Sequence, residues 1–96
     1  MTFEIEVTEE AESDLDALKP FYRREILDAI ELHLRRTPES VSRSRIKRLT
    51  GLESPGYRLR VGEFRVFYDV DSHERQVTIL RVINKEQALR YLQEER

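Results

Sequence analysis

The chain has 96 residues, of which 39% are hydrophobic and 38% charged, with a formal net charge of -2. A chain of this length can bury one modest core, so we expect one domain spanning residues 1–96. The lack of cysteine excludes disulfides, thiolate metal sites and cysteine nucleophiles, and two isolated histidines, His33 and His73, do not make a zinc site, so we expect neither a metal nor another cofactor.

The charges are distributed unevenly along the chain. Residues 1–40 carry 5 basic and 11 acidic side chains, residues 41–70 carry 7 and 3, and residues 71–96 carry 5 and 5. This pattern argues against a general affinity for nucleic acid and indicates one local basic region.

The sequence also bears on location. No apolar run approaches the length that crosses a membrane. The opening residues, MTFEIEV, lack the basic start and the apolar block of a signal peptide. We therefore expect a cytoplasmic protein.

The first 19 residues predict a strand and a helix. Apolar residues alternate with polar ones in TFEIEV, residues 2–7, which is the pattern of a strand with one buried face. Thr8 then offers an N-cap oxygen, and the acids after it suit the first turn of a helix. Apolar residues recur at helical spacing to about Lys19. They are Ala11, Leu15 and Leu18.

A second helix and a long connection follow. Pro20 suits the first position of a helix, and Pro38 ends it. The apolar stripe of this helix consists of Ile26, Leu27, Ile30 and Leu34. Residues 38–56 contain one weak apolar patch, Ile46 and Leu49, so we expect a connection with room for one turn or a short strand.

The most informative stretch is YRLRVGEFRVFYDV, residues 57–70, which reads as two strands joined at Gly62-Glu63. A two-residue connection fixes the register, so that Arg60 lies opposite Arg65. The predicted core face holds Tyr57, Leu59, Val61, Phe64, Val66, Tyr68 and Val70. On the other face two opposed arginines destabilise a sheet by roughly 0.2–1 kcal/mol. An anion bound there would relieve the repulsion.

The remaining segments complete a meander and a terminal helix. DSHER is a polar turn, and QVTILRVI is a third strand of the meander, with Leu80 and Val82 expected to face the helices. KEQALRYLQEER predicts a C-terminal helix. The order β-α-α-β-β-β-α indicates an α+β fold, with a helical hairpin packed on a mostly antiparallel four-stranded sheet.

This order, together with KRLTGLESPGYRLRVGEFRVFYDV and LRVINKEQALRY, resembles the RelE/ParE superfamily of toxins from type II toxin-antitoxin pairs. The resemblance covers nearly the whole chain. Its most specific part is YRLRVGEFRVFY, which is similar to the family's basic hairpin.

The resemblance implies a RelE-like toxin that cleaves mRNA on the ribosome and is neutralised by a cognate antitoxin, with operator DNA reached only through the antitoxin. The implied chemistry is attack by a ribose 2′-hydroxyl on the adjacent phosphate, which leaves a 2′,3′-cyclic phosphate and a 5′-hydroxyl without a metal. Two alternatives stay open: a ParE-like inhibitor of DNA gyrase, and a non-toxic corepressor that binds its antitoxin.

The resemblance also implies site residues. The implied catalytic set is Arg60, Arg65, Lys85 and Tyr91. The implied RNA-binding set is Lys47, Arg48, Arg58 and Arg81. Guanidinium groups suit this role because they bind phosphate oxygens bidentately and stay charged.

Two side chains of the implied catalytic set are candidates for proton transfer. RelE itself has lysine where this chain has Arg58 and Arg60, and arginine does not release its proton in proteins. Tyr91 is therefore the first candidate, because neighbouring arginines would lower its pKa from the usual value of about 10. Lys85 is the second.

Each of these residues also has a structural interpretation. Arg58, Lys47 and Arg48 would then be ordinary solvated side chains, and Tyr91 a packing residue. Arg60 and Arg65 would be neutralised by nearby acids such as Glu63 or Asp69.

Overall fold

The computed structural model describes residues 1–95, and this range contains three helices and five strands. In chain order these are β1 (Glu4–Val7), α1 (Glu9–Asp16), α2 (Pro20–Leu34), β2 (Ile46–Arg48), β3 (Tyr57–Val61), β4 (Phe64–Asp71), β5 (Gln76–Asn84) and α3 (Lys85–Glu95). None of the helices in this range is long and apolar enough to cross a membrane.

The sheet has five strands in the order β1-β5-β4-β3-β2, one more than the four expected. The extra strand is β2, which pairs antiparallel with β3 and sets Ile46 opposite Leu59. Both of these side chains are buried, so a three-residue strand in a polar connection is stabilised by its contact with the core. β1 runs parallel to β5, and the other pairs are antiparallel.

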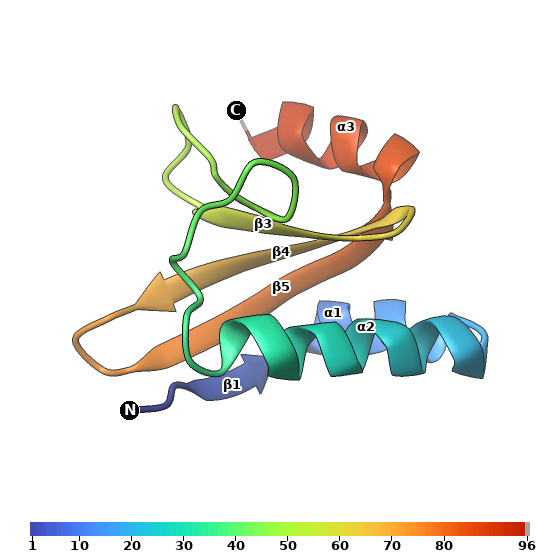
Figure 1. The fold of residues 1–96 in the computed structure, drawn as a ribbon. Helices are drawn as coiled ribbons and strands as arrows, with labels where there is room; N and C mark the ends of the chain where they lie inside the picture. The colour runs from blue at the N-terminus through green and yellow to red at the C-terminus, as the bar shows by residue number, and fades with distance from the viewer. Residues whose placement is uncertain (96) are drawn as a thin grey trace.

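The helices lie on both faces of the sheet. α1 and α2 cover one face, and α3 lies across the other (Figure 1). Thr8 caps α1 as expected, since its hydroxyl accepts from the Ala11 amide at 3.1 Å. α1 ends at Asp16, earlier than Lys19, and Pro20 begins α2 as predicted.

The main core lies between the sheet and α1–α2. Ile26, Ile30 and Leu34 from α2 are buried in it, but Leu27 is 41% exposed, so its assignment to the buried stripe was wrong. Leu27 follows Ile26 and falls beyond the edge of the contact face, because adjacent helical residues point about 100° apart. Tyr68 is fully buried, and its hydroxyl donates to the Pro38 carbonyl at 2.6 Å.

A register shift in β5 changes which of its side chains reach this core. Phe67 lies opposite Arg81 and Tyr68 opposite Ile79, which leaves Leu80 as an extra residue between them. Ile79 and Val82 are therefore buried in the main core, as expected for Val82. The expectation for Leu80 was wrong, because one inserted residue reverses the alternation of the strand.

The outer face of the sheet carries a second, smaller core under α3. Phe67, Ile83 and Ala88 are buried there, with Leu49, Tyr91 and Leu92 packed against them. Only part of this face is therefore open to solvent, and α3 borders the open part.

Candidate functional site

The β3–β4 hairpin has the register predicted from its turn. Arg60 lies opposite Arg65 and Val61 opposite Phe64, with Gly62 at a φ of +57° in the connection. Glycine adopts this left-handed conformation at little cost, which explains its place in a two-residue turn. The turn therefore places two guanidinium groups side by side on the outer face.

Arg58 extends this pair into a cluster of three arginines. It is half-buried, and its Nε is buried without a hydrogen-bond partner within residues 1–95. Burial lowers the pKa of Arg58, and the charges of Arg65 and Arg60 lower it further. Burial and Arg60 likewise lower the pKa of Arg65, against the opposite effect of Glu63. The cluster thus carries positive charge that nearby protein groups compensate poorly.

The acids that could have neutralised the cluster are engaged elsewhere. Glu63 pairs with Lys85, with 3.3 Å between the carboxylate oxygen and Nζ. Asp69 accepts from the Ser54 hydroxyl and, at 2.7 Å, from the Gly56 amide. Arg65 instead donates from Nη1 to the carbonyls of its own turn. No ion pair joins Arg60 or Arg65 to either acid in the described part of the chain.

A groove of about 370 Å³ lies where this cluster meets α3. We call it the α3 groove. Its lining combines cations with apolar side chains and consists of Arg58, Arg65, Phe67, Lys85, Glu86, Ala88, Leu89 and Leu92. Three of the predicted site residues, Arg58, Arg65 and Lys85, therefore meet at one concave surface, and Arg60 is the exposed cross-strand neighbour of Arg65.

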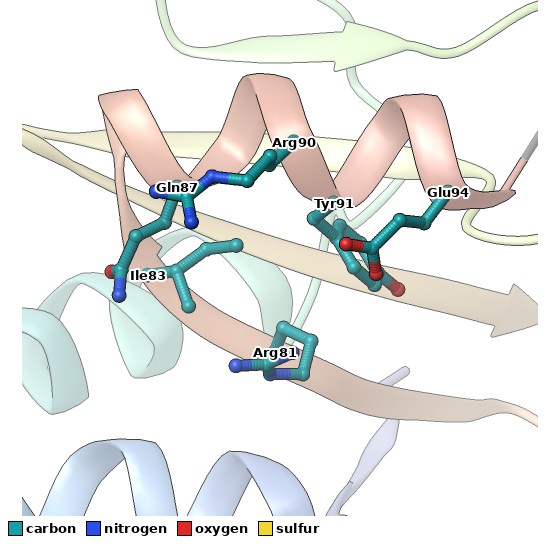
Figure 2. A pocket seen from close by; sticks show the side chains of 6 residues that line it. All are labelled: Arg81, Ile83, Gln87, Arg90, Tyr91 and Glu94. Carbon is teal, nitrogen blue, oxygen red and sulfur yellow. The ribbon is translucent and has the colours of Figure 1, made fainter.

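Tyr91 lies on the other flank of α3. It lines a separate hollow of about 160 Å³ together with Arg81, Gln87 and Arg90 (Figure 2). Its ring packs on Phe67, with 5.0 Å between centroids, and the Arg81 guanidinium carbon lies 5.7 Å from the ring centre. Tyr91 and the arginine cluster therefore line different surfaces.

The pKa of Tyr91 moves in the direction opposite to the expected one. Burial, chiefly, raises it to about 12, and the negative charge of Glu95 adds to this effect. Arg81 opposes the shift but does not reverse it. The expectation that arginines lower this pKa was wrong, because partial burial of the ring under α3 could not be foreseen from its spacing.

Arg81, predicted to bind RNA, is committed to an ion pair. Its Nε and Nη2 donate to the Asp14 carboxylate at 2.7 and 3.1 Å, and the Val82 amide donates to the same carboxylate at 2.9 Å. Asp14 was not among the residues predicted to form the site. Its position was a usable signal, because it lies between Ala11 and Leu15 on the apolar face of α1, where a buried acid needs a partner.

The two predicted RNA-binding residues of β2 have different surroundings. Lys47 is exposed and lies opposite Arg58 in the β2–β3 pair. Arg48 donates to the Gly56 carbonyl at 2.9 Å, and its guanidinium lies 4.9 Å from the centre of the Tyr57 ring. Lys47 therefore extends the basic surface, whereas Arg48 helps to hold the loop before β3.

The described residues, 1–95, hold no group of three or more His, Cys, Asp or Glu side chains arranged to bind a metal ion. The cations at the α3 groove suit an anion. Two guanidinium groups and an ammonium group can each donate hydrogen bonds to phosphate oxygens.

Comparison with known proteins gives a family and a set of similar structures. Residues 5–89 match the family described as the ParE toxin of type II toxin-antitoxin systems, parDE. A comparison with curated protein sequences gives no significant match.

Among solved structures, the chain is similar to one in the RelBE2 toxin-antitoxin complex from Mycobacterium tuberculosis, with 26% identity, a TM-score of 0.74, and coverage of 88% of this chain and 100% of that one. It is also similar to one in the archaeal RelE-RelB complex from Pyrococcus horikoshii, with 25% identity, a TM-score of 0.64, and coverage of 88% and 97%. The RelB-RelE complex from Methanococcus jannaschii, at 21% identity, a TM-score of 0.65, and coverage of 90% and 96%, shares the fold.

Proposed function

The chain belongs to the RelE/ParE superfamily of toxins from type II toxin-antitoxin systems, and from that premise we propose that it is a RelE-like toxin that cleaves mRNA on the ribosome. One observation supports this choice above the others. Arg58, Arg60 and Arg65 form a cluster whose charge is poorly compensated, beside a groove that could admit an RNA strand. Clustered guanidinium groups fit a substrate that brings a phosphate.

In the proposed reaction the 2′-oxygen of one ribose bonds to the adjacent phosphorus while the bond from phosphorus to the 5′-oxygen breaks. The proton leaves the 2′-hydroxyl for a base, and the departing 5′-oxygen takes up a proton. Arg58, Arg60 and Arg65 would stabilise the negative charge that builds on the phosphate oxygens in the transition state. This electrostatic contribution needs no proton exchange by arginine.

The surroundings of Tyr91 and Lys85 distinguish them as candidates for proton transfer. Tyr91, with a pKa of about 12, keeps its proton at neutral pH and so could donate but not accept one. It lines a different hollow from the groove beside the arginine cluster, which favours a packing role in the free protein. Lys85 lines the α3 groove together with Arg58 and Arg65 and is therefore our first candidate for proton transfer. We propose that the ribosome supplies the second proton-transfer group.

A cognate antitoxin is part of the proposal. The similar structures from Mycobacterium tuberculosis and Pyrococcus horikoshii are complexes of a toxin with its antitoxin. We propose that the antitoxin of this chain offers an acidic, amphipathic segment to the basic outer face, and that operator DNA is contacted through the antitoxin alone.

A ParE-like inhibitor of DNA gyrase is the second candidate. It is favoured by the family match, which is to the ParE toxin, and by the arginines at positions 58 and 60, which cannot act as bases. Such an inhibitor acts by binding a protein and needs no catalytic group.

The test combines both activities on the same protein preparation. Purified toxin is added to ribosomes carrying mRNA, and new 5′ ends are mapped; in parallel, supercoiling by gyrase is measured. We expect new 5′-hydroxyl ends within codons held on the ribosome, which disappear in Arg65→Ala and persist in Arg24→Ala, an exposed arginine on α2. Gyrase inhibition without new ends would establish the second candidate, and neither effect would leave the non-toxic corepressor.

A further inference from the structure

The α3 groove has an amphiphilic lining whose two parts come from different elements. Arg58 and Arg65 come from the β3–β4 hairpin, whereas Ala88, Leu89 and Leu92 come from α3. The volume of about 370 Å³ falls within the range of small-molecule pockets, roughly 300–1,000 Å³. A ligand that fills this groove must present an anionic part and an apolar part to its two sides.

We infer that the α3 groove holds one whole nucleotide of the RNA, with its phosphate at Arg58 and Arg65 and its base against Leu89 and Leu92. The inference rests on the proposed function and adds a contact to the base, which the arginines alone would not provide. It makes α3 part of the substrate site.

At the cationic end of the groove, no acid among residues 1–95 forms an ion pair with Arg58 or Arg65. Arg58 Nε is buried and has no hydrogen-bond partner within residues 1–95. This nitrogen is closed to solvent, so a ligand in the groove would meet the part of the Arg58 side chain that lines it, and the charge of that guanidinium is what an anion would compensate. Since Arg65 and Arg60 lie close enough to disfavour the charge of Arg58, a ligand that brings negative charge also relieves their mutual repulsion.

The apolar side of the groove, formed by α3, exposes a leucine at a position where a helix facing solvent would carry a polar residue. Leu89 is 69% exposed, although it lies on the same helix as the buried Ala88, and Leu92 is only partly covered. Phe67, at 0% exposure, closes the groove on the sheet side. A flat heterocyclic base can cover such side chains, as bases lodge between apolar groups in other nucleotide pockets.

The cations of the groove suit either of two anionic groups, the phosphate of a nucleotide or the carboxylate of an acidic peptide. A bridging RNA phosphate and a carboxylate each have two charged oxygens that can accept from two guanidinium groups, so the proposed function, which brings RNA to this face, is what favours the nucleotide. The remaining acid of the lining, Glu86, would repel either ligand. A peptide that inserts an apolar residue beside a carboxylate is the competing occupant, and the test is designed to separate the two.

The test uses the free protein and small probes, without ribosomes. Binding of AMP, UMP, ribose 5-phosphate and inorganic phosphate is measured by amide chemical-shift titration. We expect the nucleotides to bind roughly tenfold more tightly than ribose 5-phosphate, because a base that covers the leucine side chains removes apolar surface from water. The shifted amides should belong to β3, β4 and α3.

Two matched variants locate the base and the phosphate. Leu89→Ser should remove the advantage of the nucleotides while leaving ribose 5-phosphate binding unchanged. Leu32→Ser, which alters a leucine 75% exposed on α2, should change neither. Arg58→Ala should weaken all of the phosphate-bearing probes, since it removes the anion partner.

Several outcomes would overturn the inference. They are equal affinity for nucleotides and ribose 5-phosphate, an unchanged nucleotide advantage in Leu89→Ser, and groove binding by an acidic apolar peptide but by no nucleotide. The proposed function fails separately. If Leu89→Ser cleaves ribosome-bound mRNA like the unaltered protein while Arg65→Ala does not, cleavage stands and the base site is rejected.

Discussion

Arginines of the same chemistry have different roles in this protein because their partners differ. Arg81 is held by the Asp14 carboxylate and Arg48 by a carbonyl and an aromatic ring, so neither offers a free guanidinium to a ligand. Arg58 and Arg65 lie beside a groove, and the pKa of each is lowered by burial and by a neighbouring guanidinium. Arg58 and Arg65 are therefore the arginines that we propose bind an anion, because neither has an acidic partner among the described residues and both line the groove.

Arg65→Ala should abolish toxicity while changing stability little. The substitution relieves repulsion from Arg60 worth roughly 0.2–1 kcal/mol, but it also removes two hydrogen bonds to turn carbonyls, each worth about 0.5–1.5 kcal/mol. These effects oppose one another. Loss of a cation at the phosphate should lower cleavage by about 10²- to 10³-fold. Thermal melts and growth on induction measure the two effects, and a clearly lower melting temperature with full toxicity would contradict the assignment.

Tyr91→Phe should change the alkaline stability of the protein more than its activity. With a folded pKa of about 12 against about 10 when unfolded, the stability linked to this hydroxyl is fully present below pH 10. It is lost as the pH rises through about 12, because the unfolded chain releases the proton first. We expect the melting temperature to fall less steeply between pH 10 and 12 in Tyr91→Phe than in the unaltered protein.

The same variant tests the role of Tyr91 in cleavage at neutral pH. Since Tyr91 and the arginine cluster line different surfaces, we expect Tyr91→Phe to retain cleavage within about tenfold. A general acid would contribute roughly 10²- to 10⁴-fold. A loss in that larger range, with an unchanged melting temperature at pH 7, would identify Tyr91 as the proton donor.

Among the elements, those with strong local signals could be predicted and those made by tertiary contact could not. The two-residue turn at Gly62-Glu63 fixed the hairpin register, and with it the Arg60–Arg65 pair, from neighbours in the sequence alone. β2 is only three residues long and depends on Ile46 packing into the core. The shift at Leu80 arises from the pairing of β5 with β4, which a strand's own alternation cannot report.

At the site, too, features set by neighbouring residues could be predicted and those set by distant contacts could not. The sequence indicated that Arg58, Arg60 and Arg65 share one face, because side chains alternate along paired strands. It could not indicate that Asp14, 67 residues before Arg81, would neutralise that arginine. Nor could it indicate that α3 would cross the outer face and separate Tyr91 from the cluster, since helix packing depends on contacts distant in the chain.

The ion pair between Asp14 on α1 and Arg81 on β5 should stabilise the fold more than a surface ion pair made by the same helix. Asp14 is 15% exposed and accepts three hydrogen bonds, two from Arg81 and one from the Val82 amide. Asp14→Ala leaves these partly buried donors unpaired, so we expect a loss of about 1.5–3 kcal/mol in the free energy of unfolding, measured by urea denaturation.

Asp16→Ala provides the matched control. Asp16 lies on the same helix, and its ion pair with Arg23 spans 3.8 Å between side chains that are 72% and 41% exposed. Exposed pairs of this kind contribute at most about 1 kcal/mol. Equal losses in the two variants would mean that the Asp14–Arg81 contact adds nothing beyond an ordinary surface pair.

On the scale of the whole molecule, charge is divided between the two faces of the sheet. α1 and α2, which cover one face, belong to a segment with 5 basic and 11 acidic side chains, whereas residues 41–70, which include the arginine cluster of the other face, carry 7 and 3. An anionic partner is thus repelled by one face and attracted by the other. RNA and an acidic antitoxin segment should therefore compete for the same surface.

The proposed antitoxin segment provides the test of that division. We expect the protein encoded beside this gene to bind the toxin, to block cleavage, and to bind roughly 30-fold or more weakly to the Arg58→Ala/Arg65→Ala double variant, because losing buried interfacial charge pairs costs about 2 kcal/mol or more. Arg24→Ala on α2 should leave the affinity unchanged, since it alters the acidic face. Affinity should also fall as salt rises. If the double variant binds as tightly as the unaltered toxin, the antitoxin does not use the arginine cluster, and neutralisation must act through another surface.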